Sequence, residues 1–177
     1  MTSGRAGAAI LFVNRRGEVL LRLRGDKPGL AFPNQWDTVG GAVEPDETHA
    51  ATAARETREE IGIDLLGEVY WRDFQSVVLL HIYAAPLDIA AEDLVLTEGE
   101  RLGWFSLRAA LELPLHAWVR AVLPQFFESD LYRSLAHREP RPSFPLDNPS
   151  AGPACEHSSR SECSQAGQGA FGVAASR

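Results

Sequence analysis

Three glutamates, Glu56, Glu59 and Glu60, lie within one short segment that consists mostly of good helix formers. At about 100° of rotation per residue, a helix over residues 50–60 places all three on one arc. Carboxylates crowded in this way repel each other unless a cation lies among them. Magnesium suits such a site because it is a hard ion that prefers oxygen ligands, and Mn²⁺ is the alternative. A solvated acidic face is the other interpretation of three glutamates taken alone.

The three glutamates belong to a longer pattern with the spacing G-x5-E-x7-R-E-U-x-E-E-x-G-U, where U is apolar. Its matching positions are Gly41, Glu47, Arg55, Glu56, Glu59, Glu60, Gly62 and Ile63. The pattern resembles the signature of the Nudix hydrolases, which cleave phosphoanhydride bonds with a divalent metal. One position departs from the signature, because Thr57 stands where the family usually has Leu, Ile or Val. The resemblance implies a pyrophosphohydrolase.

The resemblance also implies roles for single residues. Glu56, Glu59 and Glu60 would form a metal platform, and the backbone carbonyl of Gly40 would add a ligand. We assign Arg55, Glu56 and Glu59 to catalysis, with the planar fork of Arg55 orienting Glu56. The general base is the residue matching Glu56 in some family members and a glutamate from a distant loop in others.

A further metal-binding carboxylate often comes from the loop before a late strand in this family. Glu98 and Glu100 both lie in such a place, shortly before Trp104-Phe105. We favour Glu98, with Glu100 as its competitor and a solvated loop charge as the alternative to both.

Three residues are candidates for contact with the substrate. Arg24 closes a Leu-Leu-x-x-Arg pattern, and an arginine there reaches substrate phosphates in similar proteins; an exposed strand-end arginine is the alternative. Trp36 could stack on a base, although core packing is the alternative. Glu47 precedes the helix N-terminus, where the helix dipole favours a carboxylate. Its alternatives are helix capping with loop anchoring, and a direct metal role.

The hydrophobic pattern predicts the elements that must position these residues. We expect a helix at Ala50–Glu60 with Thr48 as N-cap and Gly62 as C-terminal stop. The other expected elements are strands at Ala8–Val13, Glu18–Leu23, Trp36–Val39, Val69–Phe74, Val77–Ala84 and Leu102–Leu107, a loop at Asp26–Gln35, and helices at Leu107–Leu113 and Trp118–Leu135. We expect Val77–Leu80 to be buried and the last helix to be interrupted or kinked at Pro124. The result is an α/β (α+β) fold, and the resemblance implies a helix–sheet–helix sandwich with a mixed sheet.

Composition limits the classes of function and the organisation of the chain. The 177 residues carry a formal net charge of −7, which argues against a nucleic-acid partner. We expect a hydrolase domain over residues 1–137 and a Pro/Ser/Gly-rich disordered tail over residues 138–177. Cys155 and Cys163 both fall in that tail and form no disulfide framework, so we expect a cytoplasmic protein. The apolar run Ala8–Val13 is too short for a membrane helix, and a homodimer is left open.

The pattern itself does not name the substrate. ADP-ribose hydrolases of the family often carry a proline where this chain has Val78, and dinucleoside polyphosphate hydrolases a tyrosine where it has Leu79–His81. The entry to the motif is similar to the MutT-like group, apart from Val39 in place of the usual proline. We therefore expect a nucleoside triphosphate, oxidised ones included. A nucleoside diphosphate sugar hydrolase and a nucleotide-sensing module are the alternatives.

Overall fold

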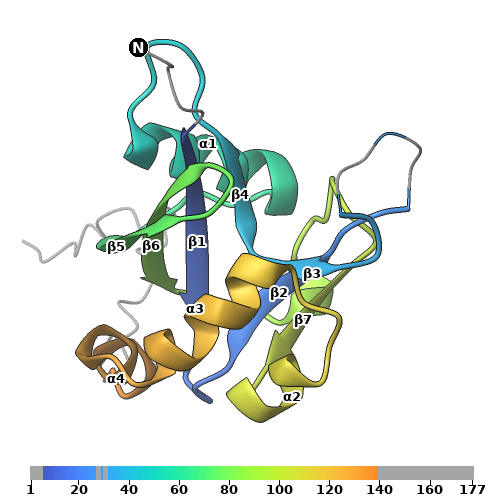
Figure 1. Ribbon diagram of the computed structural model, residues 1–177. Helices are drawn as coiled ribbons and strands as arrows, with labels where there is room; N and C mark the ends of the chain where they lie inside the picture. Colours follow the sequence, from blue (N-terminus) through green and yellow to red (C-terminus); the bar gives the residue numbers. More distant parts are fainter. Residues whose placement is uncertain (1–5, 27–28, 30–31, 139–177) are drawn as a thin grey trace, which may run out of the picture. The chain divides into compact units, whose positions relative to one another are not determined.

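The computed structural model describes residues 6–26, 29 and 32–138, in which seven strands form one mixed sheet (Figure 1). The strands are β1 (Ala6–Val13), β2 (Val19–Leu23), β3 (Trp36–Asp37), β4 (Val39–Ala42), β5 (Val69–Gln75), β6 (Leu79–Pro86) and β7 (Arg101–Phe105). The helices are α1 (His49–Ile61), α2 (Leu107–Leu111), α3 (Ala117–Phe127) and α4 (Asp130–Ala136), with a 3-10 turn η1 at Ala91–Asp93. The predicted α+β class is confirmed.

The central strand is β1, which pairs in parallel with β6 along its whole length and antiparallel with β4. Only its last residue pairs with β2, through Val13 and Val19. Strand β2 instead pairs with β7 and with β3. Strand β3 pairs with β2, and β4, which follows it after Thr38, pairs with β1. This change of partner brings the glycines of β4 alongside β1.

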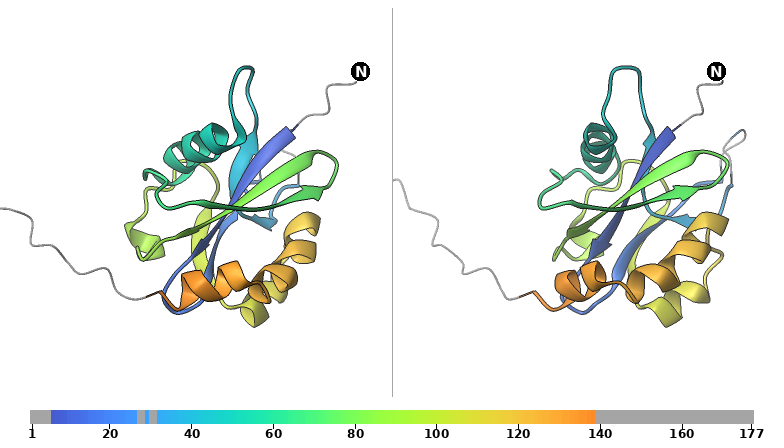
Figure 2. Two further views of the ribbon diagram at one scale, coloured as in Figure 1. Left: turned by 90° about the vertical axis from the view of Figure 1, so that its left-hand side faces the viewer. Right: turned by 60° about the vertical axis from the view of Figure 1, so that its left-hand side comes forward.

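Alternate residues of β1 supply two separate cores, because successive side chains of a strand point to opposite faces. Ala8, Ile10 and Phe12 pack in a cluster with Ala53 and Ile61 of α1. Residues 9, 11 and 13 pack in a second cluster with apolar side chains of α3. Figure 2 shows α1 on one side of the sheet and α3 and α4 on the other. The predicted helix–sheet–helix layering follows from this alternation.

Most predicted strands differ from the structure only at their ends, but two differ in pairing or burial. The strand expected over Trp36–Val39 is divided at Thr38 into β3 and β4, which pair with different strands. The segment Val77–Leu80 was expected to be buried, but Val77 is 93% exposed in the turn between β5 and β6, and residues 78–80 are only partly buried. Strand β6 accordingly begins two residues later, at Leu79.

The helix predicted over Trp118–Leu135 is two helices, and the position predicted for its interruption is wrong. Helix α3 passes through Pro124 and ends at Phe127. The break comes at Ser129, whose hydroxyl accepts a hydrogen bond from the backbone N–H of Tyr132 and so begins α4. A serine is a strongly preferred N-cap, and here it starts a new helix where a continuous one was expected.

Several expectations fall on residues outside the described part of the chain. Residues 139–177 of the predicted tail, with Cys155 and Cys163, lie there, as do parts of the loop expected at Asp26–Gln35. The domain boundary at residue 137 therefore stays a prediction. Within the described residues, no helix combines the length and apolar character that crossing a bilayer requires.

Candidate functional site

Two glycines of β4 bring the backbone of this strand directly against α1 and β1. A Cβ at Gly41 would lie 2.1 Å from Oε1 of Glu56, and one at Gly40 would lie 2.3 Å from the carbonyl oxygen of Ala8. Gly40 also has a φ of 149°, which L side chains rarely adopt. Glycine at both positions thus has a steric cause.

Helix α1 begins and ends where the sequence predicts. The Thr48 hydroxyl accepts a hydrogen bond from the backbone N–H of Ala51 at 3.2 Å, and Gly62 ends the helix with a φ of 71°. Thr57 is fully buried, and its hydroxyl donates to the carbonyl oxygen of Ala53 at 2.8 Å. The departure from the usual apolar residue at position 57 therefore leaves no unpaired polar group.

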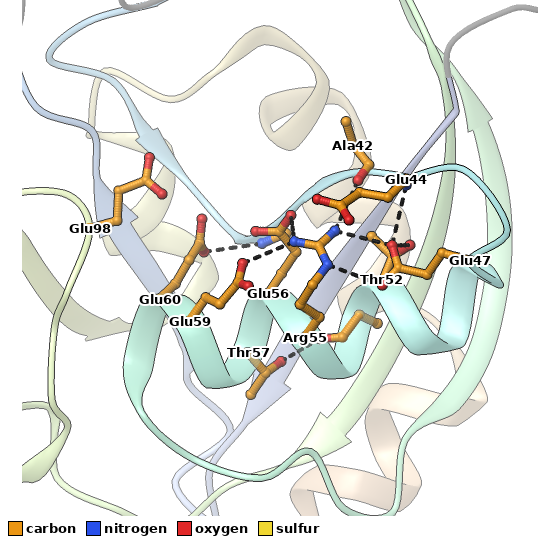
Figure 3. A network of polar contacts seen from close by, with 12 residues as sticks. Ala42, Glu44, Glu47, Thr52, Arg55, Glu56, Thr57, Glu59, Glu60 and Glu98 are labelled. Carbon is orange, nitrogen blue, oxygen red and sulfur yellow. Dashed lines mark hydrogen bonds and ion pairs between the residues drawn. The ribbon is translucent and has the colours of Figure 1, made fainter.

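Arg55 connects the glutamates of the motif to one another (Figure 3). Its Nη1 donates to Glu56 Oε1 at 2.8 Å and to Glu59 Oε2 at 2.9 Å. Its Nε and Nη2 donate to the two carboxylate oxygens of Glu47 at 3.0 and 3.1 Å. Nη2 also donates to the Ala42 carbonyl at 3.1 Å, so Arg55 ties α1 to β4.

Glu47 anchors this network. Besides Arg55, its Oε2 accepts hydrogen bonds from the Thr52 hydroxyl at 2.7 Å and from the Glu44 N–H at 3.3 Å. The hydrogen bond from Arg55 is the main cause that lowers the pKa of Glu47 to about 2. Loop anchoring, one of the alternatives to its predicted contact with substrate, accounts for all of these contacts.

Glu60 lies in a different environment from its two neighbours. It was expected on one arc with Glu56 and Glu59, apart from the packed stripe of α1, but it is buried between α1 and the sheet. Its Oε1 is 2.8 Å from Nη2 of Arg22, and its Oε2 accepts the Gly40 N–H at 3.2 Å. Burial raises the pKa of Glu60, while Arg22 and the Gly40 N–H both favour the charged carboxylate and oppose this shift.

The loop that holds Glu98 is fixed to α1 and to β2. The Thr97 N–H donates to the carbonyl of Glu60 at 3.0 Å, and Arg22 Nη1 lies 3.6 Å from Glu98 Oε1. The side chain of Glu98 is 62% exposed, and Figure 3 shows it beside Glu60. Glu100 instead accepts a hydrogen bond from the Asp26 N–H at 3.3 Å.

The glutamates fit a hard divalent cation by their chemistry. Oxygen ligands from carboxylates and backbone are what such an ion prefers, and the missing Cβ of Gly41 leaves the Glu56 carboxylate against bare backbone. Burial raises the pKa of Glu56. Within residues 6–26, 29 and 32–138, however, no three His, Cys, Asp or Glu side chains converge as a ready-made metal site. The glutamates are paired with Arg55 and Arg22.

A cavity of about 300 Å³ adjoins the same glycines. It is lined by β1, β4 and β6 together with Arg24, Asp37 and Trp118. Asp37 Oδ2 lies 3.6 Å from Nη1 of Arg24, and burial raises the pKa of this aspartate. The cavity therefore combines an apolar wall with one arginine and one buried carboxyl group, a composition typical of small-molecule sites.

Trp36 is the predicted substrate contact that the geometry argues against. Its exposed fraction is 3%, its ring meets Phe105 edge-on at 4.9 Å between centroids, and the Arg101 guanidinium lies over the ring at 5.2 Å. A base would have to displace these groups to stack on the indole. Core packing, the alternative named for Trp36, describes its contacts.

Sequence reasoning missed two residues of this region, Arg22 and Asp37. Arg22 is two residues after Leu20, so period-2 alternation places both on the α1 face of β2. A charged side chain on a buried face needs a partner, and this was the available signal. Asp37 follows a buried tryptophan in the expected strand, and its sequence offers no comparable sign.

Comparison with known proteins finds a matching family and a related protein. The NUDIX domain family matches residues 4–126. The CTP pyrophosphohydrolase of Escherichia coli (strain K12) is 34% identical over 109 residues, which are 58% of this chain and 77% of that protein.

Solved structures show the same fold. The MutT protein from Methanosarcina mazei Go1 is 28% identical, with a TM-score of 0.55, over 68% of this chain and 91% of that one. The MutT NUDIX hydrolase from Burkholderia pseudomallei is 27% identical, with a TM-score of 0.56, over 68% of this chain and 96% of that one.

Proposed function

This chain belongs to the Nudix hydrolase family, and from that premise we propose that it hydrolyses a nucleoside triphosphate to the monophosphate and pyrophosphate with Mg²⁺. Membership of the family makes it an enzyme that cleaves phosphoanhydride bonds of nucleotides. In the proposed reaction one water adds across the bond between the α- and β-phosphates. A proton leaves the water as that bond breaks.

The observation that carries the proposal is the position of β4, which lies against the glutamates of α1 and also lines the cavity. On one side, Glu56 packs against Gly41 and Glu60 accepts the Gly40 N–H. The same two glycines line the cavity that contains Arg24 and Asp37. A nucleoside bound in the cavity would therefore lie next to the part of β4 that carries no side chains, and its phosphates could extend past Gly40 and Gly41 toward the carboxylates.

Glu56 and Glu59, with backbone oxygen of Gly40, would hold the ion. Bound Mg²⁺ supplies charge neutralisation on the phosphate oxygens and a water of lowered pKa. Arg55 keeps both carboxylates in fixed directions, because one nitrogen donates to an oxygen of each. Glu56 is the group proposed to accept the proton of the water, because Arg55 and the bare backbone of Gly41 fix its carboxylate beside the proposed ion. Arg24 is proposed to contact the phosphates.

We propose CTP as the first substrate to test. The related E. coli protein bears the name CTP pyrophosphohydrolase. In the cavity, a carboxyl oxygen of Asp37 could accept a hydrogen bond from the N4 amino group of cytosine, a pairing that carboxylates make elsewhere. Nothing in the motif itself distinguishes the base, so the cavity must do so.

The test is hydrolysis of a nucleotide panel with Mg²⁺ and chromatographic identification of both products. The panel holds CTP, the other nucleoside triphosphates, an 8-oxo purine triphosphate and a nucleoside diphosphate sugar. Glu59→Gln should lower kcat at least about 100-fold, equivalent to about 2.7 kcal/mol of barrier. Glu92→Gln, on the exposed turn η1, is the matched control and should leave kcat unchanged.

Two outcomes would redirect the proposal. Cleavage of the sugar conjugate alone would replace triphosphates as the substrate class. Tight nucleotide binding by calorimetry without turnover of any member of the panel would refute the proposed reaction and identify a sensing module.

A further inference from the structure

Arg22 is a buried cation inside the acidic site. Its side chain is 3% exposed, and it is the partner of both Glu60, at 2.8 Å, and Glu98, at 3.6 Å. Its Nη1 also lies 3.5 Å from the Glu98 carbonyl oxygen. One guanidinium thus lies between two carboxylates that come from different elements, α1 and the loop before β7.

The loop that carries Glu98 closes over the stem of Arg22. A Cβ at Gly99 would lie 2.7 Å from the Leu23 carbonyl oxygen and 3.0 Å from Cγ of Arg22, and Gly99 has a φ of 100°. The N–H of Glu100 donates to that same carbonyl at 2.9 Å. Arg22 therefore lies between β2, α1 and the loop, with almost all of its side chain removed from solvent.

The terminal nitrogens of Arg22 are paired with carboxylates, whereas its Nε is not. Its Nε has no hydrogen-bond partner among the described residues, although it is buried. Buried polar groups without partners are rare in native proteins and often mark functional positions. The two terminal nitrogens, by contrast, both face Glu60 or Glu98.

The four carboxylates divide into two pairs, each with its own arginine. Glu56 and Glu59 share Nη1 of Arg55, and Glu59 is 58% exposed, so an ion can enter that pair from solvent. Glu60 and Glu98 share Arg22, whose charge is buried between them. Arg55 holds only one oxygen of each of its two glutamates, Oε1 of Glu56 and Oε2 of Glu59, so the second oxygen of each can face an ion. Both oxygens of Glu60 are engaged, Oε1 by Arg22 and Oε2 by the Gly40 N–H, so the buried guanidinium of Arg22 occupies the place where a bridging cation would otherwise lie.

We propose that Arg22 is a positioning residue that takes the place of a second divalent ion, so that the free enzyme binds one ion per chain at Glu56 and Glu59. This inference rests on the proposed metal-dependent function. Arg22 fixes Glu60 against the Gly40 N–H and holds Glu98 beside it. Removing the guanidinium while keeping the carboxylates opens the Glu60–Glu98 pair to an ion.

The experiment is titration of the purified protein with Mn²⁺ in the absence of nucleotide, read by calorimetry and by electron paramagnetic resonance. Wild type and Arg22→Lys should each bind one ion, because lysine restores the charge. Arg22→Met should bind two. The matched control is Arg108→Met on the exposed face of α2, which should bind one.

Thermal unfolding gives a second reading that does not depend on activity. In EDTA, Arg22→Met should unfold about 10 °C below wild type, because loss of one partner leaves a buried carboxylate uncompensated. Saturating Mn²⁺ should recover most of that loss in Arg22→Met. It should recover little in Arg22→Met/Glu60→Gln, which lacks the buried anion. If Arg22→Met is unfolded in EDTA, folding on addition of Mn²⁺ supports the proposal.

Other results overturn the proposal. These are two ions bound by the wild type, the same stoichiometry in Arg22→Met as in the wild type, or an Arg22→Met protein that stays unfolded at saturating Mn²⁺. The proposed function fails separately, if the wild type hydrolyses no nucleotide with any divalent ion. A wild type that hydrolyses nucleotides while Arg22→Met keeps its single ion would reject the role of Arg22 alone.

Discussion

Gly41 and Glu56 are packed so closely that no side chain fits between them. A Cβ at position 41 would lie 2.1 Å from Oε1 and 2.4 Å from Cδ of Glu56. Arg55 Nη1 holds the same Oε1 from the other side at 2.8 Å. The Glu56 carboxylate is therefore fixed between a guanidinium and bare backbone, which couples the position of β4 to the chemistry of α1.

Gly41→Ala should displace this carboxylate and lower kcat for the preferred nucleotide at least about 100-fold, or about 2.7 kcal/mol of barrier. Gly41 has no positive φ, so alanine can adopt its backbone conformation and the effect is steric. The measurement is steady-state hydrolysis together with the melting temperature, which should change far less than the rate.

Gly25→Ala is the matched control for Gly41→Ala. A Cβ at Gly25 would meet no atom within 4 Å, so both rate and melting temperature should stay at the wild-type level. Full activity of Gly41→Ala would show that the Glu56 carboxylate can move without loss of function, and this would contradict the role given to its position.

Glu47→Gln should remove a contribution to stability that depends on pH. The pKa of Glu47 is about 2 in the folded protein against 4.5 ordinarily, chiefly because Arg55 donates to it. A lowered carboxyl pKa stabilises the fold fully above about pH 4.5 and progressively less as the pH falls toward 2.

The measurement for Glu47→Gln is urea unfolding of both proteins at pH 7, 4.5, 3 and 2. The free energy of unfolding of wild type minus that of the variant should be positive at pH 7 and shrink between pH 4.5 and 2. A difference that stays constant over this range would show that the Arg55–Glu47 pair does not depend on the charge of Glu47. Glu44→Gln, the next glutamate before it, is the control.

Local patterns in the sequence predicted the motif helix and most strands well. Thr48 and Gly62 act through their own backbone neighbours, so their capping roles can be inferred from adjacent residues alone. The alternation in β1 likewise depends only on its own residues and gives both cores. Ser129 shows the limit of this reasoning, since a proline five residues earlier was the stronger local signal and was nevertheless tolerated within α3.

The candidate site was predicted less completely, because it is assembled from segments far apart in the sequence. Glu60 shares the helical arc of its neighbours, but its burial depends on Arg22, which lies 38 residues earlier on β2. Its pKa and its partners follow from this tertiary contact. Trp36 was predicted as a substrate contact for the same reason, because the sequence does not show that Phe105 from β7 packs against its ring.

Ser129→Ala should destabilise the protein by about 1 kcal/mol, because the hydroxyl caps α4 through the Tyr132 N–H at 3.1 Å. Chemical unfolding of the wild type and the variant measures this difference. Ser134→Ala, inside the same helix and without a capping role, is the control and should change the free energy of unfolding less. Equal effects of both substitutions would mean that the cap does not define the start of α4.

Asp37→Asn should change which base the enzyme prefers. A carboxyl oxygen accepts a hydrogen bond from the N4 amino group of cytosine, whereas uracil presents an acceptor oxygen at the same place. Asparagine keeps the size of Asp37 but can turn its NH2 group toward that acceptor. We therefore expect the ratio of kcat/KM for UTP to that for CTP to rise at least about 10-fold, equivalent to about 1.4 kcal/mol. Steady-state kinetics with both nucleotides measure the ratio, and Asp93→Asn on the exposed turn η1 should leave it unchanged. A ratio that does not move in Asp37→Asn would place base recognition away from this cavity, because Asp37 is the buried carboxyl group in its wall.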